Sequence, residues 1–565
     1  MQHGAIEVVR QYAEAVFRRA REPMEPPGFE VDWADQPSRH KTYPDAVRVP
    51  LATDPPRLTT LRDLLTGPQR PAGGWTLDRL ATLLRLSYGV LDRRLAVNWN
   101  QDIAKRVHFP HAVWGRATAS GGGMYPVEIY LVAGPSGPLL PGVYHYATGH
   151  HALERLLVGD VTPVVRDALG AAADGTDHYL LLSIRFWKNS FKYNTFCYHV
   201  VTQDLGALLG SWDLLARAIG APLRRVLSFD PGPLDDLLGL DGDAESVFAV
   251  VPLHWADDET PEARAAAGPE RTAVDATAPP AGRRPEVPRQ DVEPSAGATP
   301  GPRVRHVAFE RSRRVLSFPE VTAVHRAAMA PVAGDAPQEL RAAAVADLSG
   351  TPTPLPPPEL DRLDQPLSTV LRARQSSFGR FRRPPELTVA EVGTTLAFAA
   401  TGGRYPADVT PSEDGPGLTR LWVFANHVAG LAPGAYAYRA ADHALLPADA
   451  APPADMAAFL QQRYFLTNYA MTQVGAVIAI TGRLEAVLAA CGPRGYRILN
   501  AEVGTVAQYV YCAATAQGLG CGAVLGFDNV AMNEALGIDA TDERTLLFLL
   551  LGRQPDHAAE LVYQL

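Results

Sequence analysis

Two stretches of the chain repeat the same succession of apolar and polar positions. In the second stretch, residues 495–520 have apolar positions at helical spacing that stop at Gly518 and Gly520. An uninterrupted apolar run at 545–552, TLLFLLLG, then has the length of a buried strand. Each stretch predicts a helix, a Gly-rich turn, a strand, a hairpin, a long helix, a short strand and a last apolar strand.

The repeat is visible when the chain is aligned with itself at a shift of 298 residues. Residues 198–241 and 496–539 share 12 identities in 44 ungapped positions, where composition alone would give roughly three or four. Upstream, ASGGGMYP at 119–126 matches ATGGRYP at 400–406. We therefore expect an α+β protein of two duplicated halves, paired as in an ancestral dimer, with a ligand at the seam between them.

Composition marks the boundaries of these halves. The Ala, Pro, Gly and charge content of the stretch after residue 255 is typical of a flexible linker. An intervening segment with apolar character ends in the Pro-rich TPTPLPPPEL at 351–360, and we expect it to dock on one of the halves. The predicted parts are an N-terminal arm (1–60), a first half (61–255), the linker (256–303), a docking segment (304–364) and a second half (365–565).

Charge and composition exclude several classes of function. The 565 residues are 47% hydrophobic and 20% charged, with a formal net charge of -9; this predicts a folded chain that binds neither nucleic acid nor a membrane surface. The N-terminal amphipathic stretch lacks the features of a signal peptide, and no apolar run is long enough to span a bilayer, so we expect a cytoplasmic protein. The four cysteines lack metal-ligand spacing and predict packed thiols and no metal site.

The order of the short motifs provides a resemblance to a known family. ASGGGMYP, then Lys192-Tyr193, the long helix, GLGCGAVLGFD at 518–528 and the closing Gly552-Arg553 resemble the SagB-type dehydrogenases of the nitroreductase superfamily. The doubled length is similar to the azoline dehydrogenases of thiopeptide and related peptide biosynthesis. This resemblance implies tandem nitroreductase-like halves that form an intramolecular pseudodimer, a monomer in solution, with one FMN at the seam.

The resemblance also implies a phosphate-binding site in the second half. The family binds the FMN phosphate through an R-x-S motif and a C-terminal arginine, which here correspond to Arg374, Ser376 and Arg553. The motif has one extra residue before the next arginine, so Arg380 and Arg372 remain alternatives for a further contact. Several guanidinium groups and a hydroxyl suit a dianionic phosphate, although a solvated cluster of arginines is the alternative interpretation.

Small residues are the candidates for contact with the flavin ring. The segment at 518–523 fits a loose dinucleotide-binding pattern, but it ends a helix and precedes a strand, which is the reverse of a Rossmann fingerprint. Its glycines would instead let the backbone approach the reducible ring. The candidates are Val524, Leu525 and Gly526 in the second half and, from the resemblance, Ser120, Gly121 and Gly122 in the first half.

A Lys-Tyr pair is the candidate acid/base group. The resemblance aligns Lys192 and Tyr193 with a pair implicated in proton transfer during azoline oxidation, whereas the shift of 298 places Ala490 and Cys491 at the equivalent position. The first half therefore holds the acid/base pair and the second half the phosphate site, unless the pair is an ordinary helix start.

The resemblance implies oxidation of thiazoline or oxazoline rings in a ribosomally made precursor peptide to thiazoles or oxazoles. Hydride would pass to FMN, an enzymic base would take the ring-carbon proton, and molecular oxygen would reoxidise the flavin. Partners would be the azoline-bearing peptide and a cyclodehydratase or leader-binding protein. The alternatives are a general NAD(P)H-dependent nitroreductase or flavin reductase, and a non-catalytic scaffold of a biosynthetic complex.

Overall fold

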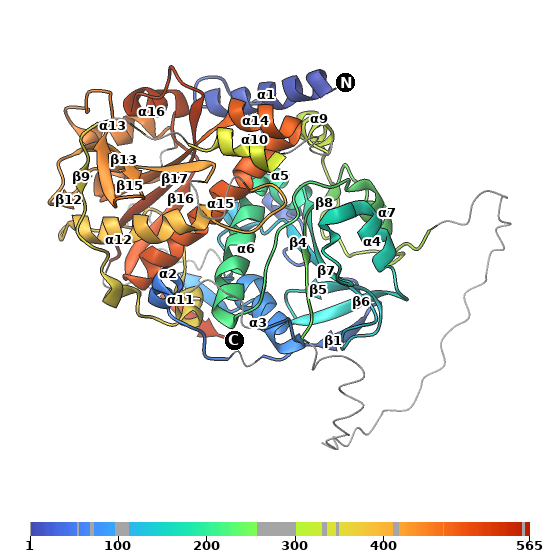
Figure 1. The fold of residues 1–565 in the computed structure, drawn as a ribbon. Coiled ribbons are helices and arrows are strands. Elements are labelled where there is room, and N and C mark those ends of the chain that lie inside the picture. The colour runs from blue at the N-terminus through green and yellow to red at the C-terminus, as the bar shows by residue number, and fades with distance from the viewer. Residues whose placement is uncertain are drawn as a thin grey trace.

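Two antiparallel sheets flank a central pair of long helices in the computed structural model (Figure 1). The expected linker at 256–303 falls almost wholly outside the described part. The structure describes all residues except 1, 54–55, 68–72, 97–111, 257–300, 330–335, 346–347, 349, 411–416, 467 and 556–559.

The first half is a six-stranded sheet, ordered β1-β6-β5-β4-β7-β8, with helices around it. Its central strands β4 and β5 are buried along their whole length, which explains why their sequences are mostly apolar. The strands are β1 (Val47–Pro50), β4 (Val127–Ala133), β5 (Gly142–Ala147), β6 (Ala152–Val158), β7 (His178–Arg185) and β8 (Glu245–Pro252). The helices are α2 (Leu61–Thr66), α3 (Leu77–Tyr88), α4 (Thr162–Leu169), α5 (Trp187–Tyr193), α6 (Cys197–Ile219) and α7 (Gly232–Leu238).

The second half repeats this strand order with one strand added. Its sheet runs β9-β14-β13-β11-β15-β17, with β16 beyond β17. The strands are β9 (Thr353–Pro354), β11 (Thr419–Ala425), β13 (Gly434–Arg439), β14 (Ala444–Pro447), β15 (Ala476–Arg483), β16 (Leu519–Val524) and β17 (Glu543–Arg553). The helices are α11 (Leu367–Ala373), α12 (Val389–Ala400), α13 (Met456–Arg463), α14 (Leu484–Cys491), α15 (Gly495–Ala516) and α16 (Asn529–Leu536). The predicted long helix and last apolar strand are confirmed as α15 and β17.

Helices α6 and α15 pack against each other at the centre of the molecule (Figure 1). A Cβ on Gly206 would lie 2.0 Å from the carbonyl oxygen of Ala501, and one on Gly504 would lie 1.9 Å from that of Gln203. Only glycine allows so close a backbone approach. Gly206 and Gly504 are equivalent at the shift of 298, so this identity reflects a contact between the halves.

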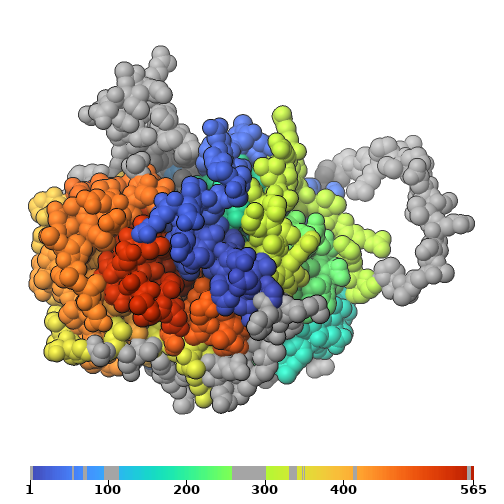
Figure 2. All heavy atoms as spheres, turned by 90° about the horizontal axis from the view of Figure 1, so that it is seen from above, coloured from blue at the N-terminus to red at the C-terminus, as the bar shows by residue number. Residues whose placement is uncertain are grey.

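Segments at the chain ends cross between the halves. Figure 2 shows the N-terminal segment in blue between the orange-red second half and the green first half, and this segment begins with helix α1 (Gln2–Arg18). Tyr12 Oη donates to the carbonyl of Thr195 in the first half (2.9 Å), and Arg10 pairs with Glu485 in the second half (2.9 Å). The C-terminal strand β18 (Glu560–Gln564) pairs with β2 (Asp92–Ala96), which also pairs with β3 (Ala112–Gly115).

The docking segment contacts both halves, not one as expected. The backbone N–H of Val304 donates to the carbonyl of Leu237 in the first half (2.9 Å). Arg483 of the second half donates to the carbonyl of Ala342 (2.9 Å). The reason is that the segment forms two helices with separate apolar faces: α9 (Pro319–Ala327) packs on α1 and α6, and α10 (Ala336–Ala343) packs on α14.

The remaining predictions from composition concern the cysteines and the membrane. All four cysteines are free and buried, which confirms packed thiols. Within the described ranges, no helix is both long and apolar enough to cross a bilayer.

Candidate functional site

The loop after α11 brings the predicted phosphate-binding residues to the edge of β16 and β17. Helix α11 ends at Ala373, and the backbone of the next residue, Arg374, is no longer helical (φ -59°, ψ 122°). The backbone N–H of Ser377 donates to the carbonyl of Cys521 on β16 (2.8 Å), and that of Arg382 donates to the carbonyl of Arg553 on β17 (3.1 Å). The structure thus places the loop that contains and follows the R-x-S motif beside β16 and the closing arginine, which comes 179 residues after Arg374.

Arg374 extends from this loop toward the first half. Its Nη2 donates to the carbonyl of Arg116 (2.7 Å), and its guanidinium lies 5.4 Å from the ring of Tyr511. The side chain is buried, yet its Nε has no hydrogen-bond partner and it forms no ion pair within the described part of the chain. A buried, unpaired guanidinium at the seam favours an anionic ligand.

The other predicted arginines differ in their surroundings. Arg553 pairs with Glu391 through both terminal nitrogens (2.7 Å each), and only its Nε lacks a partner among the described residues. Arg380 is exposed, and its backbone N–H donates to the carbonyl of Ser377 (2.9 Å). Arg372 is half-buried, and its carbonyl accepts from Arg94 (3.3 Å). Of the four arginines, Arg374 is therefore the most available to a buried anion.

Hydroxyl and backbone donors complete this side of the site. A Cβ on Gly522 would lie 2.9 Å from Ser377 Oγ and 3.5 Å from Ser376 Oγ, so both hydroxyls face the strand. Ser377 Oγ is buried and has no partner in the part of the chain that the structure describes. The backbone N–H groups of half-buried Leu525 and buried Gly526 have no acceptor there either. Buried donors are rarely left unpaired, so this edge has the features of a ligand site.

On the first half, the Gly-rich loop and the Lys-Tyr pair lie in contact. Lys192 and Tyr193 end α5. Gly122 has a positive φ of 62°, and a Cβ there would lie 2.7 Å from both Lys192 Nζ and Tyr193 Oη. Loss of contact with water lowers the pKa of Lys192 and raises that of Tyr193. The two sequence candidates of this half thus form one cluster.

Asp204 of α6 holds the Gly-rich loop in place. Its carboxylate accepts from Ser120 Oγ (2.7 Å) and from the N–H of Gly121 (2.7 Å). Burial raises the pKa of Asp204 to about 7. Sequence reasoning missed this residue, but the signal was present: the shift of 298 aligns it with Glu502, which likewise accepts from Thr419 (2.9 Å) and whose pKa burial also raises to about 7.

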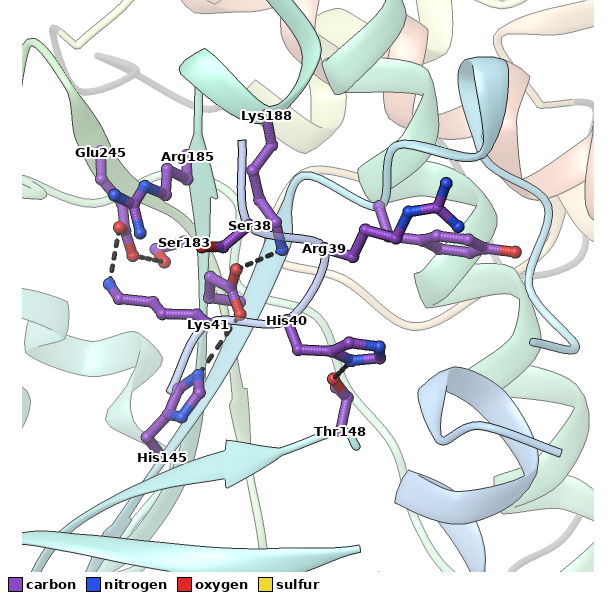
Figure 3. A network of polar contacts seen from close by, with 12 residues as sticks. Ser38, Arg39, His40, Lys41, His145, Thr148, Ser183, Arg185, Lys188 and Glu245 are labelled. Atoms are coloured by element: carbon purple, nitrogen blue, oxygen red, sulfur yellow. Dashed lines mark hydrogen bonds and ion pairs between the residues drawn. The ribbon is translucent and has the colours of Figure 1, made fainter. Parts of the chain in front are cut away.

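Helix α5 is anchored by a buried ionic network with residues of strands β4 and β5 (Figure 3). Lys188, one turn before Lys192, donates to Glu128 (2.7 Å), and Glu128 also contacts His145 (3.3 Å). Lys188 is 3% exposed and Glu128 is 2% exposed. Breaking such a pair leaves one charge buried and uncompensated. The network therefore fixes the direction of the helix that ends in the Lys-Tyr pair.

Contacts across the seam bring the two clusters together. The backbone N–H of Ala119, just before the Gly-rich loop, donates to Gln508 on α15 (3.0 Å). Tyr469 of the second half is near enough to Tyr193 to raise its pKa further, and it also packs against Gly379 of the R-x-S loop. Tyr469 therefore connects the surroundings of Tyr193 with the loop after α11.

Comparison with known proteins matches one part of the chain to a known family. Residues 371–553 match the model of the Nitroreductase family. The second half contains a nitroreductase family domain. The family implies oxidoreductase chemistry for this domain, and the matched range begins and ends with the loop and strand that form the candidate phosphate site.

Two further proteins are similar to this chain. A crystal structure of a proposed nitroreductase from Anabaena variabilis ATCC 29413 is 23% identical, covers 97% of this chain and 99% of its own, and superposes with a TM-score of 0.65. It therefore shares the mixed α/β fold over both halves. The trifolitoxin-processing protein TfxB of Rhizobium leguminosarum bv. trifolii is 25% identical over 146 residues, which are 25% of this chain and 39% of TfxB.

Proposed function

We propose that this chain is an FMN-dependent azoline dehydrogenase with one FMN at the seam of two duplicated, nitroreductase-like halves. One observation supports this proposal above all: the nitroreductase domain has four donors at the seam that find no acceptor among the described residues. Three belong to buried residues, namely Arg374 Nε, Ser377 Oγ and the N–H of Gly526, and the fourth is the N–H of half-buried Leu525.

The donor set fits FMN. A guanidinium beside two serine hydroxyls suits a phosphate dianion, so we assign Arg374 and Ser376 to the phosphate, with Ser377 as an addition that sequence reasoning missed. Arg553 would contribute through its free Nε, because Glu391 engages its other two nitrogens. Backbone N–H groups at 524–526, where no side chain intervenes at Gly526, suit the acceptor atoms of the ring.

The Lys-Tyr pair would handle the proton. FMN, when bound, supplies the hydride acceptor. Lys192 has a lowered pKa, so more of it is neutral near neutral pH and able to take the ring-carbon proton. Tyr193 has a raised pKa and stays protonated, which makes it a donor and not the base. The ring loses one hydride and one proton, and molecular oxygen accepts the two electrons to give hydrogen peroxide.

The similarity to the trifolitoxin-processing protein TfxB supports a proposal for the substrate class. We propose a ribosomally made precursor peptide with thiazoline or oxazoline rings as substrate, a cyclodehydratase as partner, and a monomeric, cytoplasmic enzyme. The halves support the duplication by their equal strand order and by the paired glycines of α6 and α15.

Mass spectrometry of an azoline-bearing peptide tests the proposal. With purified protein and air, we expect the peptide to lose two hydrogens per ring. An unchanged peptide mass with FMN-loaded protein, together with NADPH-dependent reduction of a nitroaromatic, would instead assign the chain as a general nitroreductase. A protein that binds no FMN would indicate the scaffold.

A further inference from the structure

Arg19, just after α1, places a positive charge on the loop proposed to face the flavin. Its guanidinium donates to the carbonyl of Leu525, to Asn529 Oδ1 (2.9 Å) and to the carbonyl of Val16 (2.6 Å). All three acceptors are uncharged oxygens. Loss of contact with water lowers the pKa of Arg19 to about 10, so the group stays cationic at neutral pH. The charge is therefore not neutralised by direct contact with a carboxylate.

This contact acts on a single peptide unit. The carbonyl of Leu525 and the N–H of Gly526 belong to the same amide, and a cation at the oxygen polarises that amide and strengthens its N–H as a donor. Gly526 is buried, and its N–H has no acceptor among the described residues. The strengthened donor thus points to a ligand with negative charge.

The equivalent loop of the first half shows the same arrangement with its acceptor present. The carbonyl of Leu227 accepts from Arg497 (3.3 Å) and from Arg494 (3.4 Å). The next N–H, that of Ser228, donates to the carboxylate of Asp408 (2.9 Å). At this site the chain itself provides all three groups: a guanidinium at the peptide oxygen, the peptide, and a carboxylate at the peptide N–H.

Arg494 beside the first-half loop and Arg19 beside the second-half loop come from different parts of the chain. At the shift of 298, Arg494 aligns with Phe196, which has no charge. Arg19 lies over the ring of Phe196, 4.6 Å from its centroid. Helix α1 therefore brings a guanidinium to the place that the first half leaves without one.

We propose that Arg19 is a positioning residue that strengthens the Gly526 N–H as a donor to the reduced, more negative ring of FMN, so that the N-terminal helix tunes the flavin potential. This inference rests on the proposed function. It predicts that Arg19 favours reduced over oxidised FMN.

The test is the midpoint potential of FMN bound to the full-length protein, measured by spectroelectrochemical titration. In R19M we expect about a tenfold loss of affinity for reduced relative to oxidised FMN, which lowers the potential by about 30 mV for a two-electron couple. R19K keeps the charge and should recover part of the shift. R21M is the matched control, because Arg21 binds Asp528 of the same loop at the surface (3.0 Å); its potential should equal that of the wild type.

The outcomes separate this inference from the proposed function. Wild-type protein that binds no FMN would overturn the proposed function and this inference with it. An R19M protein that binds FMN at the wild-type potential, or an equal shift in R21M, would overturn the role of Arg19 alone. If R19M fails to fold, R19K decides: the shorter side chain with a single ammonium in place of the guanidinium should still lower the potential, and a wild-type value would reject the proposal.

Discussion

At the scale of single residues, the environment of Lys192 sets its chemistry. Gly122 and Tyr193 surround its amine, and loss of contact with water lowers its pKa. The neutral form becomes more populated as pH rises through this lowered value, so a reaction that uses Lys192 as base should accelerate with pH over that range.

The first prediction concerns K192A. We expect azole formation to fall by about 10²–10⁴-fold, the usual contribution of a general base, while FMN stays bound because Lys192 is not in the phosphate site. The pH dependence of kcat/KM should lose its acid limb in the variant. Y193F serves as the comparison, because it removes a proton donor but should keep the acid limb of the kcat/KM profile. Wild-type turnover by K192A would reject the assignment.

The second prediction concerns Asp204. Burial raises its pKa to about 7 in the folded state, whereas an unfolded chain ionises near pH 4. The folded protein therefore binds the extra proton, and the wild type should lose stability as pH rises from about 4 to 7. D204N should lack this loss, which is on the order of 4 kcal/mol over the whole range and about 3 kcal/mol between pH 5 and pH 8. Denaturant titrations of both proteins at about pH 5 and about pH 8, below and above the pKa of Asp204 in the folded state, measure the difference. Equal losses of stability in the wild type and D204N would contradict the raised pKa of Asp204.

Residues of this kind mark the limit of sequence reasoning. The Lys-Tyr pair, the Gly-rich loop and the R-x-S loop could be found because they are short motifs. Arg19 could not, because its partner Leu525 lies 506 residues away and nothing local marks the contact. Asp204 lies in the aligned region, but its equivalent is Glu502, and an alignment that counts only identical residues does not reveal a pair in which Asp is replaced by Glu.

At the scale of elements, glycine determines how α6 and α15 meet. The two helices approach so closely that a Cβ on Gly504 would lie 1.9 Å from the carbonyl oxygen of Gln203. A backbone oxygen cannot move aside without displacing its helix, so extra volume there separates the halves.

The third prediction is that G504A destabilises the protein by about 1–3 kcal/mol or more, as overpacking does. G4A is the matched control: Gly4 lies in α1, is exposed and has no atom within 4 Å of an added Cβ. Alanine there should stabilise slightly, because glycine costs about 0.5–1 kcal/mol in a helix. Thermal unfolding of both variants measures this, and equal effects would refute a contact specific to the seam.

Elements with strong periodicity were predictable, and those defined by distant partners were not. Helix α15 and strand β17 follow from apolar spacing alone. The pairing of β18 with β2 depends on a contact between the chain end and the first half. Likewise, the sequence alone does not show which surfaces α9 and α10 pack on, because these surfaces form only when both halves are folded together.

At the scale of the whole molecule, the two equivalent sites at the seam between the halves differ in what fills them. Ala523 on the candidate flavin side is exposed. Its equivalent, Arg225, is fully buried, with its guanidinium 3.8 Å from the ring centroid of Tyr405. Asp408 occupies the backbone donors of the adjacent loop. The chain's own side chains thus close one site, and unpartnered donors remain at the other.

The fourth prediction follows from this asymmetry and tests the central claim most directly. The measurement is the molar ratio of FMN to chain in the purified protein, from flavin absorbance and amino-acid analysis. We expect a ratio of one for the wild type and loss of FMN from folded R374M, because methionine removes the buried guanidinium and keeps the apolar stem. A ratio of two, or an undiminished ratio in R374M, would contradict a single FMN site built from the phosphate loop of one half and the Lys-Tyr pair of the other.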